Sequence, residues 1–155
     1  MTPGLRVEVR PSAPDELSEP LSLLEEALRN GEPLLPPFAE QIERAVERGD
    51  LELLAAWADG VPVGVTVFAF RPSISLGAIF ASIEDLYVKP DARRRGVGRA
   101  LLEAVARSCA EGGVSYVEVQ VEDEEAATFY GALGYEEEPG VRVFSRSHAL
   151  FNREA

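Results

Sequence analysis

Cysteine, histidine and lysine are almost absent from this chain of 155 residues, which contains one of each, Cys109, His148 and Lys89. One Cys cannot form an internal disulfide, and one Cys with one His provides too few ligands for a typical zinc cluster. No run of about 18 apolar residues exists, which argues against a membrane-spanning helix. The N-terminal MTPGLRVEVR also lacks the apolar segment of a secretory signal. We therefore expect a cytoplasmic protein that has no metal centre and no membrane partner.

The charge of the chain is strongly one-sided, with a formal net charge of −12 at pH 7. Such a chain repels nucleic acid and anionic membranes, while it tolerates or attracts cationic small molecules. The acidic residues also serve to keep the surface solvated, which is the simpler explanation of the charge. With 46% apolar residues, residues 1–155 are expected to form a single domain.

Apolar periodicity predicts a chain of alternating strands and helices. The expected strands are residues 5–10, 51–58, 63–70, 79–88, 115–121 and 141–147. The expected helices are residues 17–28, 38–48, 101–109 and 124–133. Asp59-Gly60-Val61-Pro62 is a hairpin signal between the second and third strands. The order indicates an α/β (α+β) fold in which one mixed sheet is flanked by helices.

A cluster of arginines and glycines lies between a predicted strand and a predicted helix, with the sequence Arg93-Arg94-Arg95-Gly96-Val97-Gly98-Arg99. The first turn of a helix offers free backbone N–H groups and the positive end of the helix dipole. Gly96 and Gly98 allow the backbone to approach a pyrophosphate, and arginines pair with phosphate oxygens. The G-x-x-x-x-G-K-[ST] pattern of a Walker loop is absent, and the G-x-G-x-x-G fingerprint of dinucleotide binding fails at its third glycine.

A second segment, from Asp123 to Tyr135, follows the arginine and glycine cluster later in the chain. Together, [QR]-x-x-G-x-[GA] at Arg93–Gly98 and Ala126, Tyr130, Gly134 and Tyr135 resemble the GNAT superfamily of acyl-CoA N-acyltransferases. Asp123 stands where that family usually has Asn, which bears on an amide contact to coenzyme A. The resemblance covers residues 63–147 and is thin before them.

The resemblance implies a mixed, mostly antiparallel sheet in which strands 79–88 and 115–121 splay apart to form the coenzyme A cleft. The backbone of Leu86, Tyr87 and Val88 would pair with pantetheine, and the amides of Arg94–Arg99 would hold the pyrophosphate. Acetyl-CoA is then the co-substrate and no metal is needed. The resemblance also allows a homodimer.

Two residues are candidates for proton transfer. Glu84 would remove the proton of an amine, because an amine with a pKa of about 10.4 is mostly ammonium at neutral pH. Period 2 places Glu84 on the face of Leu86 and Val88, and Asp85 on the opposite face, paired with an arginine or facing solvent. Ile83–Val88 is similar to the diamine acetyltransferase branch, where the first acid is the base and the acid that corresponds to Asp85 contacts the substrate. A charge partner is the competing role of Glu84.

Tyr130 would protonate the coenzyme A thiolate on release, while packing beside Phe129 is its competing role. Cys109 and Trp57 are expected in the core, and His148 in an exposed position. The sequence thus predicts an N-acetyltransferase for a small, cationic primary amine. A peptide or protein N-terminal acetyltransferase and a non-catalytic acyl-CoA sensor remain the alternatives.

Overall fold

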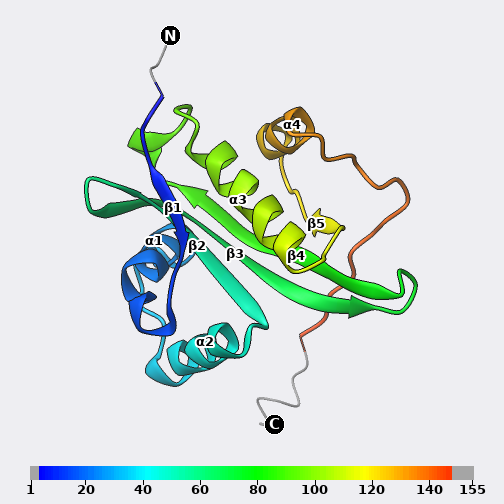
Figure 1. The fold of residues 1–155 in the computed structure, drawn as a ribbon, viewed down its shortest axis with the longest axis horizontal. Coiled ribbons are helices and arrows are strands. Elements are labelled where there is room, and N and C mark those ends of the chain that lie inside the picture. The colour runs from blue at the N-terminus through cyan, green and yellow to red at the C-terminus, as the bar shows by residue number, and fades with distance from the viewer. Residues whose placement is uncertain (1–3, 148–155) are drawn as a thin grey trace. The chain divides into compact units, whose positions relative to one another are not determined.

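The computed structural model describes residues 4–147 (Figure 1). The chain forms two compact units, one that ends at Gln120 and one that begins at Val121. The strands and helices of the first unit are β1 (Glu8–Pro11), α1 (Ser18–Arg29), α2 (Pro36–Arg48), β2 (Leu51–Ala58), β3 (Val61–Ser73), β4 (Ala78–Val88), α3 (Val97–Glu111) and β5 (Val117–Val119). Short 3₁₀ turns at Pro14–Glu16 and Pro90–Ala92 precede α1 and α3, and the second unit contains α4 (Glu124–Ala132).

The sheet has the strand order β1-β2-β3-β4-β5. Neighbours from β1 to β4 are antiparallel, and β5 is parallel to β4. This is the mixed, mostly antiparallel sheet that the sequence predicted. The predicted hairpin also forms, because Asp59 and Gly60 adopt φ values of 51° and 81°, the left-handed pair that a two-residue turn of matching twist requires.

Helices cover both faces of the sheet (Figure 1). On one face, α1 packs against β3 and β4, and α2 packs against β2. The core on this face consists of Leu17, Leu23, Leu24, Leu53, Ala55, Val65 and Val67. On the other face, α3 crosses the strands and buries Val97, Leu101, Leu102, Ala104, Val105 and Cys109. Cys109 is therefore a core residue, as expected.

Helix α3 approaches β3 closely at Gly64. A methyl group at Gly64 would lie 2.9 Å from Val97 Cγ1 and 3.1 Å from Leu101 Cδ1, both below ordinary contact distance. Since a side chain has no room there, the first turns of α3 rest directly on the backbone of β3.

Three predicted strands differ in the structure. The strand expected at residues 5–10 is observed at Glu8–Pro11. The strand expected at residues 115–121 is shortened to Val117–Val119. The strand expected at residues 141–147 is absent, and its apolar residues Val141, Val143 and Phe144 are exposed. Alternation of apolar residues is only half of what a strand needs, because the other half is a partner that accepts its backbone hydrogen bonds. Among residues 4–147 no strand pairs with this segment. His148 lies outside the described residues.

Candidate functional site

The strand β4 contains an irregularity at its two acidic residues. On β3, Val67 pairs with Asp85 and the next residue, Phe68, pairs with Ile83, so that Glu84 has no partner. The extra residue is a β-bulge, a feature that bends a strand and redirects its side chains.

The bulge corrects the prediction that Glu84 shares a face with Leu86 and Val88. Ile83 and Leu86 pair with Phe68 and Thr66, which are two residues apart on β3 and so lie on one face. Glu84 follows Ile83 and Asp85 precedes Leu86, so alternation places both acids on the opposite face of the sheet. This is the face that α1 and α2 cover. The prediction was wrong because period 2 holds only in a strand without a bulge. Asp85, expected on the face opposite to Leu86, does lie there.

The two acids differ in their surroundings. Glu84 is exposed and Asp85 is partly buried. Burial raises the pKa of Asp85 above its ordinary value of 3.8, and the neighbouring Glu84 carboxylate adds to this increase. No ion pair between Asp85 and an arginine, the partner expected from the sequence, occurs among the described residues. A carboxylate with a raised pKa is a stronger base than a solvated Asp, so that this face of β4 holds two adjacent proton acceptors.

Beyond the bulge, one edge of β4 is unpaired. The parallel pairing with β5 extends only over Ala81–Ile83, where Ala81 N–H donates to the Tyr116 carbonyl at 2.9 Å. From Asp85 to Val88 the strand is paired with β3 alone within the described part of the chain. The backbone groups on this edge are therefore available to an extended ligand.

The register decides which backbone groups lie on the open edge. Lys89 N–H donates to the Val63 carbonyl at 2.9 Å, which makes Gly64 and Val88 a pair without mutual hydrogen bonds. Pairs with and without mutual hydrogen bonds alternate along the two strands, so Leu86, like Val88, is in a pair without them. Tyr87 lies between these two residues and exchanges hydrogen bonds with Val65. Of the three residues expected to pair with pantetheine, Leu86 and Val88 thus direct their N–H and C=O groups to the open edge, and Tyr87 directs its groups to β3.

The arginine and glycine segment forms a turn that leads from β4 into α3. Arg94 and Gly96 have φ values of 61° and 88°, both in the left-handed region. Residues of this kind curl successive N–H groups toward one side, which produces an anion-binding concavity. Gly96 is also the residue before the first turn of α3, and apart from its chain neighbours no described residue has an atom within 4 Å of the place where its side chain would be. Val97, Gly98 and Arg99 then present the free N–H groups of that turn.

The arginines of this turn have different environments. Arg99 pairs with Glu103 on the exposed side of α3, at 3.4 Å. The carbonyl of Arg95 accepts a hydrogen bond from Leu5 N–H at 3.0 Å, which ties the N-terminal segment to the turn. Arg93 donates from Nε to the Val88 carbonyl at 2.8 Å, a bond that no sequence pattern indicates.

The second unit carries Asp123 and Tyr130. Asp123 caps α4, since its Oδ1 accepts a hydrogen bond from Ala126 N–H at 2.8 Å. Asp and Asn are about equally favourable as N-cap residues, so Asp123 caps α4 as well as Asn would. Tyr130 is buried against Phe129 and Tyr135, with ring centroids 5.1 and 5.3 Å away. Burial, and secondarily Tyr135, raises the pKa of Tyr130 to about 12, so that its hydroxyl keeps its proton at neutral pH.

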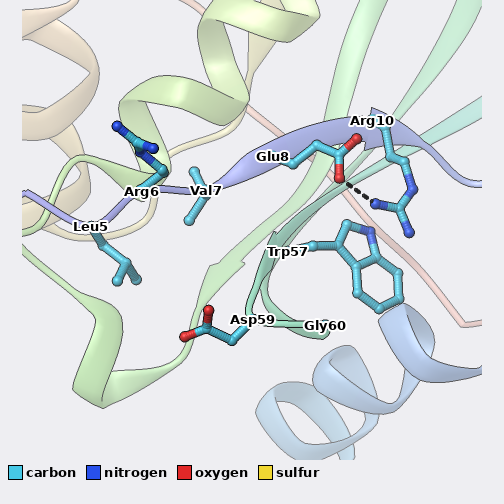
Figure 2. Close-up of a pocket in the computed structure, with 8 residues that line it drawn as sticks. All are labelled: Leu5, Arg6, Val7, Glu8, Arg10, Trp57, Asp59 and Gly60. Carbon is cyan, nitrogen blue, oxygen red and sulfur yellow. Dashed lines mark hydrogen bonds and ion pairs between the residues drawn. The ribbon is translucent and has the colours of Figure 1, made fainter.

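A pocket of about 590 Å³ lies elsewhere in the first unit, between β1 and the β2–β3 turn (Figure 2). Its lining residues are Leu5, Arg6, Val7, Glu8, Arg10, Trp57, Asp59 and Gly60. Arg10 pairs with Glu8 at 2.9 Å and covers the Trp57 ring at 4.5 Å. The indole N–H of Trp57 is buried and has no hydrogen-bond partner among residues 4–147. None of the predicted site residues lines this pocket.

Other candidates carry no chemistry in the described residues. Burial, and secondarily Glu52, raises the pKa of Cys109, which keeps the thiol protonated and inert. Residues 4–147 contain no group of three or more His, Cys, Asp or Glu side chains placed to hold a metal ion. In the same part of the chain, no helix has the length and apolarity needed to cross a membrane.

In a comparison with known families, residues 17–135 match the acetyltransferase (GNAT) family. Among characterised proteins, thialysine N-epsilon-acetyltransferase of Caenorhabditis elegans is 27% identical over 99 residues. That alignment covers 63% of this chain and 61% of the relative, so the chain matches less than two thirds of the relative's length.

Solved structures share the fold over nearly the whole chain. An aminoglycoside acetyltransferase from an uncultured soil metagenomic sample, in complex with sisomicin, superimposes with a TM-score of 0.80 at 20% identity, covering 92% of this chain and 96% of that one. AAC(6′)-Iy, in complex with the bisubstrate analogue CoA-S-monomethyl-acetylneamine, gives 0.77 at 25% identity, covering 92% and 99%.

Proposed function

Since this chain belongs to the GNAT acetyltransferase family, we propose that it transfers an acetyl group from acetyl-CoA to the primary amine of a small, cationic molecule. The observation that carries the proposal is the continuity of the open edge of β4 with the turn at Arg94–Gly98. An extended pantetheine chain and a pyrophosphate occur in that order along coenzyme A. The two surfaces occur in the same order along this chain. The family match spans residues 17–135, which supports one acetyltransferase domain across both units.

Each part of the chain has a distinct task in this proposal. The N–H and C=O groups of Leu86 and Val88 orient the pantetheine amides, as a neighbouring strand would. The N–H groups of Gly96–Arg99 and the arginines around them bind the pyrophosphate. Bound acetyl-CoA supplies a thioester, whose carbonyl carbon the amine attacks directly in a ternary complex.

The acids on β4 are proposed to receive the proton of the amine and to attract its charge. Glu84 is exposed and can contact an amine substrate from the solvent side. Asp85 beside it is partly buried, and its raised pKa makes it more basic than an ordinary Asp. The bulge supports a shared role because it directs both carboxylates to one face. Two adjacent carboxylates fit a cationic amine, and so does the net charge of −12.

Tyr130 is proposed to donate a hydrogen bond to the departing thiolate. Its support is local to the second unit, namely the motif, the burial and a pKa of about 12. A thiol has a pKa of about 8.5, so full transfer from such a tyrosine to a thiolate is uphill by about 3 to 4 pKa units. We therefore expect stabilisation of the thiolate by a shared proton, followed by exchange with solvent.

The acceptor class follows from the acids and from the relatives. A relative acetylates thialysine by its name, and two similar structures are aminoglycoside acetyltransferases or hold an acetylated neamine analogue. Thialysine, aminoglycosides and neamine are amines that carry positive charge at neutral pH, and this is the kind of acceptor that we propose.

A thiol-release assay with acetyl-CoA tests this proposal. The panel should contain polyamines, thialysine, aminoglycosides and peptides with free N-termini. We expect turnover with a polyamine, thialysine or an aminoglycoside and none with peptides, and we expect added salt to raise KM for the amine. Turnover with peptides alone would favour the N-terminal acetyltransferase. Silence across the panel, with coenzyme A bound in calorimetry, would favour a sensor.

A further inference from the structure

Arg93 occupies part of the open edge of β4. The Pro90–Ala92 turn folds the chain back, and Arg93 Nε then donates to the Val88 carbonyl at 2.8 Å. The guanidinium carbon lies 5.5 Å from the centre of the Tyr87 ring, close enough for a cation–π contact. Arg93 has no carboxylate partner among the described residues, in contrast to Arg10, Arg29, Arg48 and Arg99.

The carbonyl that Arg93 holds is one that an extended ligand needs. Only Leu86 and Val88 direct backbone groups to the open edge, so the edge offers two carbonyl acceptors between the bulge and the end of β4. An amide N–H of pantetheine that bonds to Val88 must share or take the position of Arg93. The same side chain lies three residues before Gly96, next to the turn proposed for the pyrophosphate.

We propose that Arg93 exchanges partners, holding the Val88 carbonyl in the free protein and pairing with the pyrophosphate when acetyl-CoA binds. This inference rests on the proposed function. The exchange makes Arg93 a specificity-determining residue. When acetyl-CoA displaces Arg93 from the Val88 carbonyl, its pyrophosphate gives Arg93 a charge-assisted hydrogen bond in exchange. A neutral pantetheine thioester displaces Arg93 in the same way but has no phosphate with which Arg93 could pair.

The size of the effect follows from the strength of such a bond. A hydrogen bond of this kind lowers the fraction of protein with a free Val88 carbonyl, and the apparent affinity of a competing ligand falls by the same factor. For net bond strengths in proteins, this factor is about 2- to 10-fold. Removing the side chain should therefore strengthen binding of a neutral ligand and weaken binding of coenzyme A.

The test compares two ligands on two variants. Arg93→Met keeps an apolar stem against Tyr87 and removes the donor and the charge. Arg94→Met is the matched control, because it removes the same charge from the adjacent residue, whose side chain makes no hydrogen bond or ion pair with residues 4–147. The ligands are coenzyme A and pantetheine, titrated into ¹⁵N-labelled protein, with the Leu86 and Val88 amide signals as the readout.

We expect Arg93→Met to bind pantetheine about 2- to 10-fold more tightly and coenzyme A about 10-fold more weakly than the wild type. Arg94→Met should weaken coenzyme A and leave pantetheine unchanged. The coenzyme A effects should shrink in high salt, while the pantetheine effect should not.

Three outcomes would overturn the inference. If Arg93→Met binds pantetheine like the wild type, the Val88 carbonyl accepts both donors and no exchange occurs. If Arg93→Met binds pantetheine more weakly, Arg93 holds β4 in its binding shape. If the wild type binds neither ligand, the proposed function fails and the exchange fails with it. Matched thermal denaturation midpoints confirm that the variants are folded.

Discussion

The two halves of β4 have the same backbone but different neighbours. From Ala78 to Ile83 the strand pairs with β3 and, over its last three residues, with β5, and Ala81 and Ile83 are buried. From Asp85 to Val88 it pairs with β3 alone among the described residues, and its side chains are half-buried. The bulge at Glu84 separates the halves. The first half is part of the core, whereas the second half has one edge without a neighbouring strand. The comparison shows that this edge opens where the regular register against β3 is interrupted.

The largest effect should come from the end of the open half, where the chain enters α3. Gly96→Asp should weaken coenzyme A on the order of 100-fold or more, because a carboxylate would face the pyrophosphate at short range. Gly96→Asn is the control, since it has the same shape and the same positive φ without the charge. We expect Asn to cost only a few-fold in calorimetry. Equal losses for Asp and Asn would show that the backbone conformation, not the charge, decides binding.

Proline substitution should separate the two halves directly. Ala81→Pro removes an N–H that bonds to the Tyr116 carbonyl, so stability should fall by about 1 to 3 kcal/mol. Leu86→Pro removes an N–H on the open edge, so stability should fall less while coenzyme A binding is lost. Denaturant unfolding and calorimetry measure the two quantities, with Leu86→Ala as the side-chain control. A loss of stability as large for Leu86→Pro as for Ala81→Pro would contradict the assigned directions.

A change in the second unit should leave both halves of β4 intact. Tyr130→Phe keeps the packing against Phe129 and Tyr135, so coenzyme A should still bind while turnover falls about 10- to 100-fold. The raised pKa of about 12 adds a signature in stability. The protonated form is favoured in the fold, so that the wild type should lose stability as pH rises from about 10, the ordinary pKa of Tyr, through 12. Tyr130→Phe should not show this loss. Unaltered turnover would leave Tyr130 a purely structural residue.

The bulge residue itself should have a smaller effect, which depends on pH. Glu84→Gln should lower kcat/KM by up to about 10-fold near neutral pH, where the amine is mostly ammonium. The defect should shrink as pH approaches the pKa of the amine. A defect that is constant across pH would identify Glu84 as a binder of the cation. No defect at all would leave proton removal to Asp85 or to water.

The smallest effect is expected at Asp85. Its raised pKa means that the charged form is penalised in the fold, so Asp85→Asn should raise the thermal midpoint slightly at neutral pH. Below the ordinary pKa of 3.8 both proteins carry a neutral side chain, and the difference should vanish. A wild type that is more stable than Asp85→Asn at neutral pH would imply a favourable partner for the carboxylate.

The sequence predicted those elements whose signals are local. The hairpin at Asp59-Gly60, the helices and the turn before α3 all contain residues with strong conformational preferences. The bulge has no such signal, because Ile83-Glu84-Asp85-Leu86 fits a regular strand equally well. Only the register against β3 reveals it. The face of Glu84 was mispredicted for that reason.

Partners distant in the sequence account for the other differences. The apolar alternation at residues 141–147 was sufficient to suggest a strand, although the described residues provide no neighbour for it. The bond from Arg93 to Val88 depends on the path of a short turn, and arginine in a phosphate motif gives no hint of it. Features that depend on residue type could be predicted from the sequence, whereas features that depend on contacts between residues of the folded chain could not.

The close approach at Gly64 also bears on the proposed anion site. Because Val97 and Leu101 lie directly on the backbone of β3, the sheet holds the N–H groups of the first turn of α3 in a fixed orientation. A ligand then loses little affinity to conformational entropy on that side. The turn before α3 is held from the other side as well, since Leu5 N–H donates to the Arg95 carbonyl. Coenzyme A, bound as proposed, would thus meet backbone donors that are already in position before it arrives.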